Sequence, residues 1–170
     1  AHLHENLEQL VQERTAALTA DVAERKRVQE EQARLVAILE ATPDFVSSGY
    51  LDGHVFYINA AGLRMLGFGP GQDISVLRVG EGHPEWAAKL VHDEAIPHAI
   101  EHGTWSGETS LLRRDGREIP VSQVIIAHKG KTGSVAYLST IMRDLSRRKE
   151  AEARVARLNR VYSVLSGINT

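Results

Sequence analysis

Residues 2–41 contain neither proline nor glycine, and apolar side chains recur at heptad-like intervals near both ends of this segment. Charged and amide side chains fill much of its middle. This pattern predicts one continuous helix, which at about 1.5 Å per residue would span roughly 60 Å. Because such a helix is too long to fold back on a small core, we expect it to pair with a second copy in a parallel coiled coil. The alternative is an exposed, charged helix without a partner.

The composition argues against several classes of function. The 170 residues carry a net charge of −2 without a cluster of Lys and Arg interleaved with aromatics, so we expect no nucleic-acid partner. The absence of cysteine excludes disulfides, thiolate metal sites and covalent chemistry on sulfur. No apolar run approaches the roughly 18 residues of a membrane-spanning helix, and no signal peptide opens the chain. We therefore expect a cytoplasmic segment without membrane contact, and any inner-membrane anchor of the parent protein would lie outside it.

A repeated Asp-x-x-x-Arg-Lys element brackets the middle of the chain, at residues 21–26 and again at residues 144–149. Pro43 cannot continue the first helix and disfavours helical geometry at the residue before it. The chain is therefore predicted to have three parts. These are an N-terminal coiled-coil signalling helix (1–41), a globular domain (42–145) and a C-terminal linker helix (146–170).

The globular part begins with a strand pattern and a short helix. Two strands are expected at residues 45–50 and 54–58, because the Asp52-Gly53 pair between them is typical of a tight hairpin turn. Asn59 is suited to cap the short helix that follows, and Gly67 is suited to end it.

A second helix is expected to open at His83-Pro84 and to stop at Gly103, with a kink or break at Pro97. Three strands joined by hairpins follow, at residues 104–113, 118–128 and 134–144. Apolar side chains lie on both faces of the last two strands, so we expect both faces of the sheet to be covered.

This order of elements, together with several short motifs, resembles PAS sensor domains. The motifs are Phe56-Tyr57-Ile58-Asn59-Ala60-Ala61, Leu66-Gly67-Phe68, His83-Pro84, Gly107-Glu108, Arg114-Asp115-Gly116 and Met142-Arg143-Asp144-Leu145-Ser146. The resemblance covers about residues 30–153. It implies an α+β fold in which a five-stranded antiparallel sheet carries helices on one face. A small pocket is then expected between the sheet and the helix of residues 84–102.

The resemblance also implies a function. A PAS module of a bacterial sensor histidine kinase or cyclic-di-GMP enzyme, such as a diguanylate cyclase, relays signals between flanking helices and catalyses nothing itself. Residues 157–166 resemble the helix that leads into the next module of such proteins. We expect a homodimer held by the N-terminal helix and a face of the sheet, and an effector domain covalently linked in the parent protein. A dimerising spacer that binds no ligand is the alternative.

Candidate residues for the pocket and for signal coupling follow from this resemblance. Asp144 closes the last strand in the triplet Asp144-Leu145-Ser146. Its carboxylate can accept hydrogen bonds from the backbone N–H of Arg147 or Lys149 as a helix cap, and can pair with an arginine such as Arg114. Trp105, Asn59 and Gln123 are candidates to contact a flavin, although light-driven adduct formation needs a cysteine that the chain lacks. The full set of candidate pocket residues is Asn59, Leu90, Val91, Ala95, Trp105, Gln123 and Ser139.

Two histidine patterns give further alternatives. The segment His92-Asp93-x-x-Ile96 resembles the ligand segment of haem-binding PAS sensors, which makes His92 the candidate axial ligand of a haem. The segment His98-Ala99-Ile100-Glu101-His102 matches the zinc motif of inverted metalloproteases, in which two histidines bind zinc and the glutamate activates water. A pocket filled by the chain's own side chains, with no cofactor, stays open beside haem, flavin and zinc.

Overall fold

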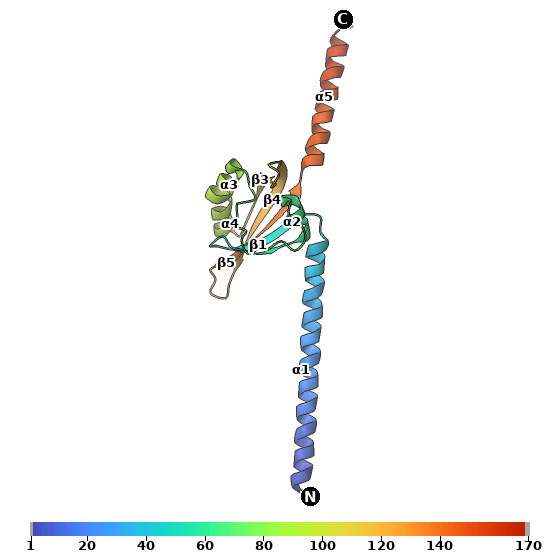
Figure 1. Ribbon diagram of the computed structural model, residues 1–170, viewed down its shortest axis with the longest axis vertical. Helices are drawn as coiled ribbons and strands as arrows, with labels where there is room; N and C mark the ends of the chain where they lie inside the picture. Colours follow the sequence, from blue (N-terminus) through green and yellow to red (C-terminus); the bar gives the residue numbers. More distant parts are fainter. Residues whose placement is uncertain (1, 169–170) are drawn as a thin grey trace. The chain divides into compact units, whose positions relative to one another are not determined.

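The computed structural model describes residues 2–168 and divides the chain into two compact units, with the boundary between Ala41 and Thr42 (Figure 1). Helix α1 (His2–Ala41) forms the first unit and confirms the predicted continuous helix. It buries none of its side chains. Ion pairs one turn apart, such as Asp21 with Arg25 at 3.0 Å, stabilise it locally by about 0.2–0.5 kcal/mol each. Its apolar side chains are therefore largely exposed to solvent, and its pairing with a second copy stays a prediction.

The second unit is built on a five-stranded antiparallel sheet, which confirms the predicted architecture. The strands lie in the order β2-β1-β5-β4-β3, so the last strand of the chain occupies the centre of the sheet. Their bounds are β1 Phe45–Tyr50, β2 Val55–Ile58, β3 Thr104–Leu112, β4 Glu118–Lys129 and β5 Val135–Asp144.

Helix α2 (Ala60–Leu66) begins and ends where the sequence predicts. The buried Asn59 side chain accepts a hydrogen bond from the backbone N–H of Gly62 at 2.9 Å and a second from that of Val46 at 3.0 Å. Gly67 ends the helix with φ of 86°, a left-handed conformation that glycine adopts without strain. Asn59 thus fastens α2 to strand β1.

Pro97 divides the second helical stretch, as expected. The stretch runs as α3 (Glu85–Leu90), a π-helical turn η1 (Val91–Ala95) and α4 (Ile96–His102), with Pro97 in the first turn of α4. Proline has no N–H to donate to the preceding turn, so the regular α-helical bonding is interrupted there, and the N–H of Ile96 just before Pro97 bonds the carbonyl oxygen of Val91 five residues back. Figure 1 shows α3 and α4 together on one side of the sheet.

The inner face of the sheet, beneath these helices, carries the core. One cluster consists of Phe45, Ile58, Leu66, Leu111, Ile119, Val121 and Met142. The other consists of Val91, Ala95, Ala99, Ile125 and Leu138 and joins the helices to strands β4 and β5. Burying a Val, Leu, Ile, Phe or Met side chain stabilises a fold by about 1.5–3 kcal/mol, so the larger members of these clusters hold the sheet and the helices together.

The outer face of the sheet is partly open in this single chain. Ile141 of β5 lies opposite Val46 of β1 and Val124 of β4, yet 38% of its surface remains exposed. Four rings also pack together on this face: Phe56 packs against Tyr50 and Tyr137, and Tyr137 stacks on His128. The prediction that both faces are covered therefore holds for the inner face, whereas the outer face is partly exposed in the single chain.

Helix α5 (Ser146–Ile168) follows directly from β5. Its first turn is anchored by Leu145, which is buried and donates its N–H to the carbonyl oxygen of Pro120 at 2.9 Å. The central strand of the sheet therefore continues into the outgoing helix without a flexible linker between them.

Candidate functional site

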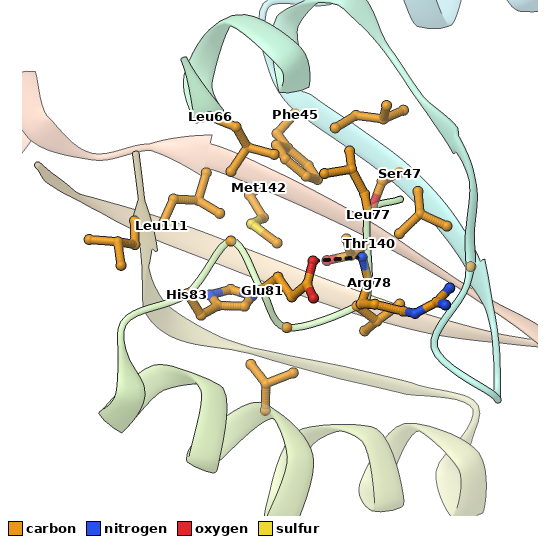
Figure 2. Close-up of a pocket in the computed structure, with 18 of the residues that line it drawn as sticks. Phe45, Ser47, Leu66, Leu77, Arg78, Glu81, His83, Leu111, Thr140 and Met142 are labelled. Carbon is orange, nitrogen blue, oxygen red and sulfur yellow. Dashed lines mark hydrogen bonds between the residues drawn. The ribbon is translucent and has the colours of Figure 1, made fainter. Parts of the chain in front are cut away.

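A cavity of about 460 Å³ lies between the inner face of the sheet and the loop and helices that cover it. This volume is within the roughly 300–1,000 Å³ of small-molecule sites in proteins. Both core clusters contribute to its walls. Its principal apolar residues are Phe45, Ile58, Leu66, Leu77, Leu111 and Met142, most of which are labelled in Figure 2.

The loop of residues 77–83 covers the cavity and is fixed at both ends. Near its start, Val79 donates its N–H to the carbonyl oxygen of Gly53 at 2.9 Å. At its end, the carbonyl oxygen of Gly82 accepts a hydrogen bond of 2.7 Å from the N–H of Leu112 in β3. Figure 2 shows this loop crossing the cavity with Glu81 and His83 beside each other on it.

One wall carries a buried polar network centred on Gln123, which is only 1% exposed. Its Oε1 accepts a hydrogen bond of 2.6 Å from the hydroxyl of Thr109, and its Nε2 donates one of 3.2 Å to the hydroxyl of Thr140. Thr140 in turn donates to the carbonyl oxygen of Val124 at 3.1 Å. The network links strands β3, β4 and β5 on the cavity side of the sheet, and these bonds use much of its own hydrogen-bonding capacity.

His83 presents a histidine ring to the same cavity. Its Nδ1 lies 2.7 Å from the carbonyl oxygen of Ser110, and because a carbonyl can only accept, Nδ1 carries the proton. Burial lowers the pKa of His83 below the usual histidine range, against a smaller opposing effect of the Ser110 carbonyl. The ring is therefore neutral near pH 7, with a lone pair on Nε2.

The structure separates the candidate pocket residues into two groups. Val91, Gln123 and Ser139 line the cavity, whereas Asn59, Leu90, Ala95 and Trp105 are not among its lining residues. The hydroxyl of Ser139 is bonded to that of Ser48 at 2.8 Å. Of the three residues considered for flavin, Asn59 is engaged in capping α2, and only Gln123 reaches the cavity.

The position of Trp105 has a steric cause. A Cβ atom placed on Gly107 would lie 2.6 Å from the indole ring, so the indole occupies the space directly over that glycine. It packs there against the cluster of Val91, Ala95, Ala99, Ile125 and Leu138. Trp105 therefore closes the core beside the cavity and does not bound it.

Neither histidine pattern forms the site that it suggested. The side chain of His92, the candidate haem ligand, is 87% exposed, pairs with Asp93 and is not among the residues that line the cavity. His98 and His102 stack on each other, and the Nδ1 atoms contact the carbonyl oxygens of Thr104 and His98. No third ligand joins them, because within residues 2–168 no three potential metal ligands are gathered.

Sequence reasoning did not identify His83, Glu81 or Ser47 as cavity residues. The sequence predicts a helix start at His83-Pro84 and places Ser47 in a strand. Glu81 lies in a stretch without periodicity, so nothing in the local pattern indicates that this loop folds over the sheet. For Ser47, strand alternation with the buried Phe45 was the available signal.

The residues expected to couple the domain to α5 are also separated. Asp144 accepts a hydrogen bond of 2.7 Å from the N–H of Ser146, whereas the predicted donors are Arg147 and Lys149, and the N–H of Lys149 bonds the carbonyl oxygen of Leu145. Arg114 instead lies 5.1 Å above the ring of Phe68, at the rim of the cavity. Among the described residues it forms no ion pair with Asp144, since its guanidinium lies over the Phe68 ring instead.

Glu108 of β3 makes the connection to α5 that Arg114 does not. One carboxylate oxygen lies 2.7 Å from a guanidinium nitrogen of Arg148, and the other lies 2.8 Å from Nζ of Lys149. The hydrogen bond from Lys149 is the main cause that lowers the pKa of Glu108. The next residue along the strand is Thr109, which bonds Gln123 in the cavity wall. Glu108 therefore ties the first turn of α5 to a strand that also forms the cavity.

Comparisons with known proteins agree with this architecture. The family profile of the PAS domain matches residues 43–147. A PAS domain from Colwellia psychrerythraea is 19% identical, with a TM-score of 0.62 over 71% of this chain and 98% of that one. The PAS domain of an HTR-like protein from Haloarcula marismortui is 22% identical, with a TM-score of 0.59 over 71% and 97%.

The N-terminal domain of a diguanylate cyclase with a PAS/PAC sensor, from Marinobacter aquaeolei, is 17% identical, with a TM-score of 0.53 over 62% of this chain and 98% of that one. Likenesses at these identities show the fold alone. The comparison with curated proteins gives no match. None of the helices in residues 2–168 has the length and apolar character needed to cross a bilayer. Because the family profile spans more than half of the sequence and the sheet has the same fold, this chain belongs to the PAS domain family.

Proposed function

We propose that this chain is a sensory, signal-relay module of a bacterial signalling protein, such as a histidine kinase or a diguanylate cyclase. In this proposal a small molecule binds in the cavity and changes the conformation of the domain. The domain transmits this conformational change to the helices on either side and catalyses no reaction. It works in the cytoplasm as a homodimer, through α1 and the outer face of the sheet. The effector domain of the parent protein follows α5.

The observation that carries this proposal is the double role of strand β3. Its inward side chain Thr109 is bonded to Gln123 in the cavity wall, and its outward neighbour Glu108 holds Arg148 and Lys149 of α5. A ligand that displaces the Gln123 amide would shift Thr109, and with it the anchor of α5. Such a ligand changes the output only through its different affinity for the two arrangements of α5.

The absence of cysteine from the chain makes a direct test simple. A single cysteine replaces the exposed Leu158 of α5, and the rate of crosslinking between two copies is measured with a bis-maleimide. The same measurement on Ser47→Phe, in which an added ring occupies part of the cavity, imitates a bound ligand. We expect the crosslinking rate to differ between the two proteins. Equal rates in two folded proteins would contradict the proposal.

An absorption spectrum of the purified protein checks the cofactor alternatives. Flavin and haem each absorb strongly in the visible range. A flavin spectrum would identify the molecule in the cavity, whereas a haem spectrum would require an iron ligand other than His92, whose ring faces solvent.

A further inference from the structure

Only some of the polar side-chain groups that line the cavity are left to bond a ligand. Gln123 and Thr140 already bond to each other and to Thr109 and Val124. The groups left for a ligand among the lining residues are therefore chiefly those of His83, Glu81 and Ser47.

His83 can only accept a hydrogen bond from a ligand. Its one ring proton is on Nδ1 and is given to the carbonyl oxygen of Ser110 at 2.7 Å. A ligand in the cavity thus meets the unprotonated Nε2. The other tautomer, with the proton on Nε2, is disfavoured, because its unprotonated Nδ1 would place a lone pair against a lone pair of the Ser110 carbonyl oxygen.

Glu81 adds a second acceptor beside His83. Its Oε2 accepts a hydrogen bond of 3.1 Å from the backbone N–H of Arg78, which leaves Oε1 available. Figure 2 shows Glu81 and His83 on the same loop, with the Glu81 carboxylate directed toward the backbone nitrogen of Arg78. The hydroxyl of Ser47, on the opposite wall, forms no hydrogen bond within the described part of the chain and can donate or accept.

The arginines around the cavity do not form a site for an anion. The side chain of Arg78 extends away from Glu81, toward the β1–β2 turn (Figure 2), where its Cδ lies near Gly53. Arg113 pairs with Asp115 and also donates to the carbonyl oxygen of Arg64. Arg114 lies over the ring of Phe68. Their charges nevertheless offset that of Glu81, so a cation gains little from the carboxylate.

We propose that the ligand of this cavity is an uncharged, largely apolar molecule with an O–H or N–H group that donates to Nε2 of His83, with Glu81 as a second acceptor. Its apolar part lies against Phe45, Leu66, Leu111 and Met142. A phenol, an indole or a comparable ring compound has this chemistry. The inference rests on the proposed function, because it names the chemical class that the module detects.

The test compares four probes that share one naphthalene ring. The first, 2-naphthol, is a neutral hydrogen-bond donor, and 2-methoxynaphthalene is neutral without a donor. The third, 2-naphthoate, is an anion, and 2-(aminomethyl)naphthalene is a cation. Calorimetric titration of the full chain should show 2-naphthol binding at least about tenfold tighter than each of the other three, since a buried acceptor left unpaired costs about 1–3 kcal/mol. Equal affinity for the methoxy compound, tighter binding of either ion, or no binding by any probe would overturn the proposal.

His83→Asn isolates the acceptor. An asparagine amide can still donate to the Ser110 carbonyl oxygen from nearly the position of Nδ1, but it has no group in place of Nε2. The preference for 2-naphthol should fall to less than about threefold in this variant and stay unchanged in the control His92→Asn, which alters an exposed histidine outside the cavity. A preference retained in a folded His83→Asn protein would refute the role of His83.

The crosslinking assay at position 158 separates this inference from the proposed function. If 2-naphthol binds with the expected preference and leaves the crosslinking rate unchanged, the ligand class stands and the relay function fails. If Ser47→Phe changes that rate and no probe shows the preference, the relay stands and the ligand class fails.

Discussion

Glu108 of strand β3 and Lys149 of helix α5 are joined by a contact of 2.8 Å, although they are far apart in the sequence. Arg148 contacts the other oxygen of the same carboxylate. All three side chains are roughly half exposed, so the contacts are screened by water and add little to global stability. Their consequence is geometric, because they fix the direction in which α5 leaves the sheet.

Glu108→Gln should therefore loosen α5 without unfolding the domain. We expect an almost unchanged thermal midpoint, together with faster amide hydrogen exchange over residues 146–152 and a changed crosslinking rate at position 158. Glu150→Gln removes one negative charge from α5 itself and serves as the control. Similar exchange in both variants would show that the contacts of Glu108 do not hold the helix.

The buried neutral ring of His83 makes stability depend on pH. Because burial lowers its pKa in the folded state, the unfolded chain binds a proton first as the pH falls below the ordinary value of about 6.5. Stability is therefore highest above that value and falls as the pH decreases toward the lowered pKa. Urea unfolding of the wild type between pH 7.5 and pH 5 should show this loss, and His83→Asn should show a smaller one. If the free energy of unfolding depends equally on pH in the two proteins, His83 is not the buried neutral group responsible.

Substitutions of Asp144 test whether its hydrogen bond at the start of α5 is needed to transmit the signal. Asp144→Ala removes the acceptor of the Ser146 N–H and should cost about 1 kcal/mol, while leaving the sheet folded. We expect the crosslinking rate at position 158 to stop responding to Ser47→Phe. Asp144→Ser retains a capping oxygen and should restore part of the response. A full response in Asp144→Ala would limit this residue to a local structural role.

Much of the fold follows from the sequence because its boundaries depend on local chemistry. Asn59 and Gly67 bound α2 as predicted, and Pro97 divides the second helical stretch, since caps and proline act within one turn of chain. Strand alternation also places Val121 and Ile125 on one face of β4, although which face is the inner one is decided only by the fold, where both are buried.

The site could not be predicted to the same degree, because it depends on contacts between segments remote in sequence. The loop that carries Glu81 and His83 has no repeating pattern, and its bonds to remote residues such as Gly53 and Leu112 place it over the sheet. Arg114 and Glu108 lie on the same strand–turn segment, yet only the fold decides which of them meets α5. His92 and His98 matched linear motifs whose geometry the helices do not supply.

Gly107 gives a prediction about packing beside the cavity. In Gly107→Ala the new methyl group would lie 2.6 Å from the indole of Trp105, so the indole must leave its place on the strand. Such a clash in a packed region costs about 1–3 kcal/mol. In a Trp86→Phe background, where Trp105 is the one remaining tryptophan, its emission should shift to longer wavelength. An unshifted spectrum would mean that the indole does not occupy this position.

The outer face of the sheet is where we expect two copies to meet. Ile141 lies at its centre between Val46 and Val124, and a carboxylate there would face the same patch of a second copy. Ile141→Glu should therefore weaken self-association in sedimentation velocity while the far-UV circular dichroism stays unchanged. Ile100→Glu is a matched control, because Ile100 of α4 is 39% exposed, close to the 38% of Ile141, and lies away from this face. Equal effects of the two variants would indicate a general consequence of added charge, and a monomeric wild-type chain would exclude the interface. Weakening by Ile141→Glu alone would instead assign the outer face to the dimer, because the two variants differ only in where the same charge is placed.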